Sequence, residues 1–173
     1  MTEDRQFIPL DIAVLTVSDS RSMAEDTSGA LLADLLDASG HRLHDRKLVA
    51  DDRYAIRAVV SAWIADPACQ VVLTTGGTGL TGRDGTPEAL RPLFDKEIEG
   101  FGEMFRYLSW QDIRTSTLQS RATAGVANGT YLFVLPGSSG ACRDAWTKII
   151  EAQLDYRTRP CNMAELIPRL QER

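Results

Sequence analysis

Two patterns of apolar residues organise the first 80 positions of the chain. Short apolar runs rich in β-branched residues are typical of strands, and a strand buried on both faces of a sheet is apolar throughout. Strands of this kind are expected over residues 11–18 and 69–74, and residues 41–49 can form another strand. Between them, apolar residues recur three and four positions apart, which predicts helices that begin near Asp26 and near Asp51 or Asp52. The sequence therefore predicts two strand–helix–strand units.

The middle of the chain is less regular. Pro87 suits the first turn of a helix, but Pro92 and Gly100 interrupt the residues after it, so we expect a broken helical insertion. Aromatic residues in this insertion are common both in protein cores and in subunit interfaces, and we expect two of them to be in the core. These aromatic residues are Phe101, Phe105, Tyr107 and Trp110.

The last third of the chain returns to clear patterns. The pair Asn128-Gly129 lies between β-prone flanks and predicts a hairpin within residues 123–134. Residues 131–135 then form the last central strand, and a helix follows the turn at 136–140. Beyond Leu154 the chain is polar and basic, and we expect an extended tail.

Alternating strands and helices predict an α/β fold, namely a doubly wound, mainly parallel sheet with helices on both faces and one antiparallel hairpin. A length of 173 residues fits a single domain. We assign residues 1–173 to that domain, with a short N-terminal arm at 1–10 and a C-terminal tail at 155–173.

Charge and composition narrow the function classes. The chain carries 19 Lys and Arg against 24 Asp and Glu, a net charge of −5, which gives no general attraction to nucleic acid or to an anionic membrane. No apolar run approaches the ~20 residues of a membrane span, and no signal-peptide pattern opens the chain, so we expect a cytoplasmic protein. Its three cysteines form no CxxC pair, and we expect them to be reduced and buried.

Ligands of such sheets bind at the carboxyl ends of the strands, which directs attention to the loops at 19–26, 75–86 and 136–140. The segment from Thr74 to Glu88 reads TTGGTGLTGRDGTPE. Clustered glycines either make a tight connection that needs positive φ or let backbone N–H groups cradle an anion. Its place after a buried strand favours the anion site. Three polar loops at one edge suggest a substrate with more than one phosphate, or two phosphorylated substrates.

Aspartates near the glycine segment add a candidate metal site. Asp84 lies in the glycine segment, and Asp51 and Asp52 follow the second strand at the same edge of the sheet, where they could supply a second carboxylate. Mg²⁺ is commonly held by one or two carboxylates together with phosphate oxygens. The alternatives are a turn aspartate for Asp84 and a helix cap for Asp51 or Asp52.

Taken together, several segments resemble the MoaB/MogA family of molybdenum cofactor biosynthesis proteins over residues 12–161. The segments are TTGGTG, RDGTPEA, EDTSG, DDRYAIRAVVSAWI and LPGSSGACRDAW, and TSTLQSRATAGVANGT and TRPCN are more similar to the MoaB branch. The resemblance implies a molybdopterin-binding fold and an Mg²⁺- and ATP-dependent adenylyltransferase. In that reaction the terminal phosphate of molybdopterin attacks the α-phosphate of ATP, and pyrophosphate leaves.

The resemblance also implies roles for individual residues. Asp51 and Asp84 match the family's catalytic, Mg²⁺-linked carboxylates. The matching substrate and nucleotide site comprises Thr75, Gly76, Gly77, Thr78, Gly79, Ser138, Ser139, Ser28 and Gly29. Ser139 replaces the second proline that many relatives carry in the late turn.

Two further expectations come from the resemblance. The protein is expected to form a homo-trimer or a homo-hexamer. Arg83, Asp84, Thr86 and Pro87 retain the loop pattern of active members, which favours an enzyme. The alternative interpretation is a non-catalytic molybdopterin-binding or scaffold protein of the same pathway.

Overall fold

A computed structural model of the protein describes residues 5–172. Six strands form one sheet in the order β2-β1-β3-β6-β5-β4. The four strands from β2 to β6 are parallel, whereas β5 runs antiparallel to β6 and β4 runs antiparallel to β5. The strands are β1 (Asp11–Val17), β2 (Arg42–Val49), β3 (Val71–Thr75), β4 (Lys96–Glu97), β5 (Thr123–Ala127) and β6 (Thr130–Leu135).

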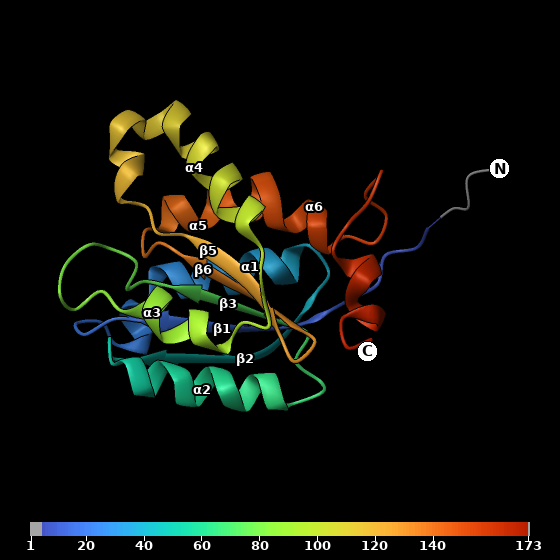
Figure 1. The fold of residues 1–173 in the computed structure, drawn as a ribbon, viewed down its shortest axis with the longest axis horizontal. Coiled ribbons are helices and arrows are strands. Elements are labelled where there is room, and N and C mark those ends of the chain that lie inside the picture. Colours follow the sequence, from blue (N-terminus) through green and yellow to red (C-terminus); the bar gives the residue numbers. More distant parts are fainter. Residues whose placement is uncertain (1–4, 173) are drawn as a thin grey trace.

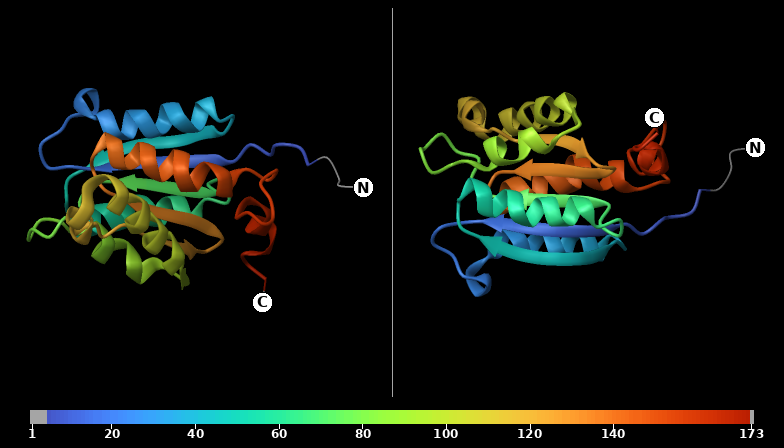
Figure 2. Two further views of the ribbon diagram at one scale, coloured as in Figure 1. Left: turned by 90° about the horizontal axis from the view of Figure 1, so that it is seen from above. Right: turned by 60° about the horizontal axis from the view of Figure 1, so that its bottom comes forward.

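Helices cover both faces of the sheet (Figure 1). One face carries α1 (Thr27–Ala38), α4 (Glu99–Ile113) and a continuous helical run from α5 (Ser139–Ala145) through residues 146–150 to α6 (Glu151–Leu154). The other face carries α2 (Arg53–Ala65) and α3 (Thr86–Leu90). Figure 2 shows the two helical layers from above and from the α2 side. The doubly wound α/β fold is thus confirmed.

Two apolar cores hold these layers together, one on each face. On the first face Leu32, Phe101 and Trp146 are buried against the sheet, and on the second Ile56 and Trp63 are buried. β1 and β3 are buried along almost their whole length because helices lie on both sides of them. Phe101 and Phe105 are in the core, whereas Tyr107 is 67% exposed and Trp110 is 47% exposed, as the expectation of two core aromatics requires.

Local predictions at two helix starts and at the hairpin are confirmed. Asp26 caps α1, and Pro87 lies in the first turn of α3. Asn128 and Gly129 both adopt positive φ, 48° and 82°, which suits the tight hairpin between β5 and β6.

Three expectations were wrong. The C-terminal tail is not extended, because Ala164–Arg169 form a 3-10 turn, η5, whose partly buried apolar residues pack against the core, and the hydroxyl of Tyr131 donates to the carbonyl of Met163. The insertion before β5 contains the short strand β4 as well as helices. Cys161 is exposed, although Cys69 and Cys142 are buried as expected. Within residues 5–172, no helix combines the length and apolar character needed to cross a membrane.

Candidate functional site

The carboxyl ends of β1, β3 and β6 lie side by side at one edge of the sheet. Thr16 of β1 is in register with Thr75 of β3, which is in register with Leu135 of β6. The loops after these strands enclose a hollow of about 400 Å³, a size typical of small-ligand sites. It is lined by Thr16, Val17, Ser18, Ser20, Arg21, Ser28, Thr75, Gly76, Gly77, Gly137 and Ser138. The three loops singled out in the sequence therefore meet.

Residues 75–86 form the glycine loop, and two of its glycines approach their neighbours too closely for side chains. Gly76 and Gly77 have φ of 99° and 66°, in the left-handed region. A Cβ on Gly76 would lie 2.2 Å from the carbonyl oxygen of Val17, and one on Gly77 would lie 2.2 Å from Oγ1 of Thr86. The Thr86 hydroxyl donates to the Gly76 carbonyl at 2.8 Å, and the Thr86 N–H donates to the Gly77 carbonyl at 3.0 Å. Each of these carbonyls lies opposite the next N–H in a planar peptide, so the N–H groups of Gly77 and Thr78 point away from Thr86. Gly77 lines the hollow, and an exposed loop amide of this kind can bind an anion.

Two helix N-termini point at the same hollow. Asp26 caps α1, and the Oγ of Ser138 caps α5 by accepting from the N–H of Ala141 at 3.2 Å. Helix N-termini attract anions through their free N–H groups and the helix dipole. Ser28 and Ser138 line the hollow, as predicted. The N–H of Gly29, in contrast, already donates to Asp26 Oδ1 at 2.9 Å, so Gly29 serves the cap.

A buried polar network supports this end of α1. Asp26 Oδ2 accepts from the Thr16 hydroxyl at 2.7 Å and from Nη2 of Arg46 at 2.8 Å, and the Asp26 side chain has no exposed surface. Burial by itself raises the pKa of Asp26, but the hydrogen bonds from Arg46, Thr16 and Gly29 outweigh it and lower the pKa below its ordinary value. The Asp26 carboxylate is therefore ionised near neutral pH, at the junction of the first loop and α1.

Of the two predicted catalytic carboxylates, Asp51 lies against Gly77 of the glycine loop, and Asp84 belongs to the loop and lies against Gly79. Asp51 Oδ2 would be 2.7 Å from a Cβ on Gly77, and its Oδ1 accepts from the N–H of Gly85 at 3.2 Å. Asp84 accepts at Oδ2 from the Thr81 hydroxyl at 2.6 Å and from the Thr81 N–H at 2.9 Å. Neither carboxylate is among the residues that line the hollow, but Asp51 adjoins it across Gly77.

The electrostatic setting of the two carboxylates differs. Burial raises the pKa of Asp51, and together with repulsion from Asp84 and Asp19 it outweighs the opposing effects of the Gly85 N–H and Arg83. The hydrogen bond from the Thr81 hydroxyl leads the effects that hold the pKa of Asp84 below its ordinary value. The question of which aspartate caps α2 is also answered, since Asp52 accepts from the N–H groups of Tyr54 and Ala55, which leaves Asp51 outside the cap.

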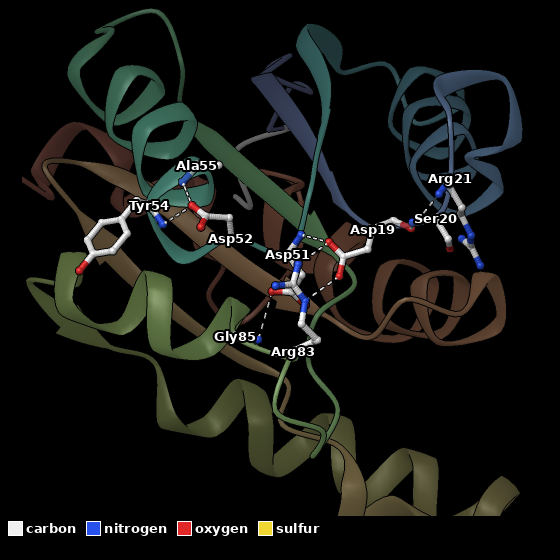
Figure 3. A network of polar contacts seen from close by, with 10 residues as sticks. Asp19, Ser20, Arg21, Asp51, Asp52, Tyr54, Ala55, Arg83 and Gly85 are labelled. Carbon is white, nitrogen blue, oxygen red and sulfur yellow. Dashed lines mark hydrogen bonds and ion pairs between the residues drawn. The ribbon is translucent and has the colours of Figure 1, made fainter.

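An ion pair links the glycine loop to the first loop (Figure 3). Nη2 of Arg83 lies 2.8 Å from Oδ1 of Asp19, and the N–H of Asp51 donates to the same carboxylate at 2.9 Å. Arg21 projects away from this pair, at the rim of the hollow. Arg83 is therefore neutralised by Asp19, whereas Arg21 is placed to meet an anionic ligand.

Some predicted site residues have other surroundings. Thr78, Gly79 and Ser139 are not among the residues that line the hollow. The carbonyls of Thr78 and Gly79 accept hydrogen bonds from Arg121, and Oγ of Ser139 lies 3.3 Å from Oγ1 of Thr27. Sequence reasoning gave no role to Arg121, although the segment TSTLQSRATAGVANGT contains it, because its partners in the glycine loop lie far earlier in the chain.

A model of the protein family described as "Probable molybdopterin binding domain" matches residues 13–156. The chain belongs to this molybdopterin-binding family. It is 62% identical over 157 residues to molybdenum cofactor biosynthesis protein B of Escherichia coli strain K12, covering 91% of this chain and 92% of that protein.

Solved structures of the molybdopterin-binding family agree with the fold. A crystal structure of molybdenum cofactor biosynthesis protein B is similar with a TM-score of 0.84 and 42% identity, covering 87% of this chain and 94% of that one. The tungsten cofactor synthesizing protein MoaB from Pyrococcus furiosus is similar with a TM-score of 0.77 and 37% identity, over 84% of this chain and 92% of that one. The resemblance to the MoaB/MogA family drawn from the motifs is thereby confirmed.

Proposed function

We propose that the protein binds molybdopterin in molybdenum cofactor biosynthesis and adenylylates its terminal phosphate with ATP and Mg²⁺. The observation that carries this proposal is a single hollow at which a glycine loop and two helix N-termini converge, with the carboxylates of Asp51 and Asp84 against glycines of that loop. Backbone amides at such positions bind phosphate groups without formal positive charge. An acidic protein can therefore hold two strongly anionic substrates.

The carboxylates at this edge fit a divalent cation. Asp19, Asp51 and Asp84 lie close enough for repulsion to raise the pKa of Asp51, and Arg83 supplies one compensating charge. A hard cation with oxygen ligands suits such a set of donors. In residues 5–172, no group of three or more His, Cys, Asp or Glu side chains is arranged to hold a metal, so phosphate oxygens would complete the coordination. We assign Asp51 and Asp84 to Mg²⁺, which when bound would neutralise phosphate charge.

The reaction makes limited demands on the side chains. An oxygen of the molybdopterin phosphate forms a bond to the α-phosphorus of ATP, the bond from that phosphorus to the bridging oxygen breaks, and pyrophosphate leaves with the electron pair. A phosphate dianion attacks as an anion and needs no general base. Positioning and charge stabilisation then supply the catalysis, and the amide of Gly77 and the guanidinium of Arg21, which both belong to residues that line the hollow, are placed for this role.

A second candidate function is molybdopterin binding without turnover. The contacts of Arg83 and Asp84 favour it, because Asp19 pairs with Arg83 and Thr81 donates twice to Asp84. For catalysis, Arg83 would have to leave Asp19, and Asp84 would have to leave Thr81, when the substrates bind.

One experiment separates the two candidates. Pyrophosphate release is measured anaerobically with molybdopterin, ATP and Mg²⁺, and molybdopterin binding is measured by isothermal titration. We expect release by the wild type, and its loss in Asp84→Asn with molybdopterin binding retained, because the asparagine oxygen still accepts from Thr81. Asp95→Asn is the matched control, since Asp95 accepts from the N–H of Asn128 at 2.7 Å at the remote hairpin. Binding without release by the wild type would establish the non-catalytic function, and equal release by Asp84→Asn would refute the role of Asp84.

The surface of α4 supports the proposed self-association into a trimer or hexamer. Apolar side chains are exposed along α4 and the 3-10 turn η3 (Arg114–Gln119), which stand out from the body in Figure 1. They are Met104, Tyr107, Trp110, Ile113 and Leu118. Contiguous exposed apolar surface commonly marks an interface. We expect sedimentation velocity to show an oligomer that Trp110→Ser weakens, and a wild-type monomer at micromolar concentration would refute self-association.

A further inference from the structure

The side chain of Arg121 binds backbone carbonyls of the glycine loop. It lies between η3 and β5, and its side chain is 26% exposed. Its Nε donates to the carbonyls of Thr78 at 3.2 Å and Gly79 at 2.9 Å, and its Nη2 donates to the carbonyl of Asp84 at 3.1 Å. Its Nη1 pairs with Glu88 on α3. Arg121 is not among the residues that line the hollow. Its Nε and Nη2 bind carbonyls of the glycine loop, and only its Nη1 binds a residue outside that loop, Glu88.

Each carbonyl held by Arg121 belongs to a planar trans peptide, whose N–H points the opposite way. In the Thr78–Gly79 peptide the carbonyl faces Arg121, and the N–H of Gly79 is among the groups that lower the pKa of the Asp84 carboxylate, whose Oδ2 would lie 2.6 Å from a Cβ on Gly79. In the Asp84–Gly85 peptide the carbonyl again faces Arg121, and the N–H of Gly85 donates to Oδ1 of Asp51 at 3.2 Å. The guanidinium of Arg121 therefore binds the carbonyls of two peptides, and the N–H ends of these peptides face the carboxylates of Asp84 and Asp51.

Arginine suits this position better than lysine. A guanidinium presents its five donors in a rigid plane, so it can bind several carbonyls at fixed angles, whereas an ammonium is a single point charge. A cation at the carbonyl end also polarises the peptide and strengthens the hydrogen bond made by its N–H. The ion pair with Glu88 adds one more contact that fixes the plane of the guanidinium.

We propose that Arg121 is a positioning residue, which sets the placement of Asp51 and Asp84 through the two peptides between it and them. This inference rests on the proposed function for its catalytic consequence, because these carboxylates are the groups assigned to Mg²⁺. Its structural content, the orientation of the Gly79 and Gly85 amides, is independent of any reaction.

The structural content is tested on the free protein by amide hydrogen exchange. In Arg121→Lys we expect the Gly79 and Gly85 amides to exchange about tenfold faster or more, while amides of β1 keep their protection. Arg57→Lys is the matched control, because Arg57 also donates to two backbone carbonyls, those of Ala89 at 2.8 Å and Glu88 at 3.0 Å, but outside the glycine loop. Wild-type exchange at Gly79 and Gly85 in Arg121→Lys would overturn the proposal.

The catalytic consequence is tested by kinetics of pyrophosphate release. We expect Arg121→Lys to lower kcat about tenfold with the KM for ATP changed less than about twofold, because the hollow keeps its lining. An unchanged kcat, or a raised KM alone, would overturn the positioning role. If the wild type releases no pyrophosphate, the proposed function fails, and hydrogen exchange alone decides the role of Arg121. If Arg121→Lys does not fold, Glu88→Gln replaces it, with a smaller acceleration of the same two amides expected and wild-type rates overturning the proposal.

Discussion

Replacing Asp26 with asparagine tests whether the buried polar network at the start of α1 stabilises the folded protein at the edge of the sheet where the hollow lies. Asp26 Oδ1 accepts from the N–H of Gly29, and Oδ2 accepts from Thr16 and Arg46. An asparagine has one acceptor oxygen in place of two. Whichever way its amide turns, the NH₂ group faces a donor, either the N–H of Gly29 or the guanidinium of Arg46. The Thr16 hydroxyl can rotate and accept, so one strong hydrogen bond and one ion pair are the interactions at stake.

The magnitude depends on burial. Leaving a buried donor unsatisfied costs about 1–3 kcal/mol, and breaking a fully buried ion pair costs about 3–5 kcal/mol. The side chain of Asp26 is fully buried but that of Arg46 is 22% exposed, which reduces the second cost. We expect Asp26→Asn to lower the free energy of unfolding by about 3 kcal/mol, and the melting temperature by about 6–12 °C for a chain of this size.

The effect should depend on pH with a definite sign. The pKa of Asp26 is lowered in the folded protein, so ionised Asp26 contributes its full stabilisation above its unfolded pKa of about 3.9. That contribution declines as the pH falls from this value through the folded pKa. The stability difference between wild type and Asp26→Asn should therefore be constant near neutral pH and shrink below about pH 4.

Urea unfolding followed by circular dichroism, repeated from pH 7 downward, measures these differences. Asp112→Asn is the control, because the exposed Asp112 pairs with Lys148 at 3.3 Å and such surface pairs contribute less than about 1 kcal/mol. A double-mutant cycle with Arg46→Met assigns the share that belongs to the ion pair. A loss below about 0.5 kcal/mol in Asp26→Asn, or a difference that grows in acid, would refute the reasoning.

Two further predictions concern the glycine loop and the thiols. Gly77→Ala should lose pyrophosphate release and be destabilised by about 1–3 kcal/mol, because the φ of Gly77 is 66° and the new Cβ would lie 2.2 Å from the Thr86 hydroxyl. The control is Gly82→Ala, whose new Cβ has no neighbour within 4 Å and which should match the wild type in the same urea and activity assays. A thiol reagent at pH 8 should modify Cys161 rapidly, whereas Cys69 and Cys142 should react only after unfolding. Burial raises the pKa of Cys69 to about 12 and that of Cys142 to about 11, so rapid modification of all three thiols would contradict the burial.

Much of the fold could be predicted because it rests on local patterns. The apolar run of β1, the cap at Asp26 and the Asn128-Gly129 turn are each set by neighbouring residues, and each prediction is confirmed. The packed C-terminal segment was missed because η5 has little apolar periodicity and owes its place to contacts with the sheet, such as the hydrogen bond from Tyr131. Propensity and turn chemistry carry no signal for such contacts.

The candidate site divides in the same way. The sequence alone determined the family, the three loops that line the hollow and the residues that resemble the family's catalytic carboxylates, because these lie in contiguous motifs. Only the tertiary structure decided that Asp52 rather than Asp51 caps α2, that Asp19 neutralises Arg83, and that Arg121 holds the glycine loop. The reason is physical, since hydrogen bonds and ion pairs depend on distances of a few ångströms between atoms from remote segments. Those distances are set by the register of β1, β3 and β6 and by the packing of the helices upon them.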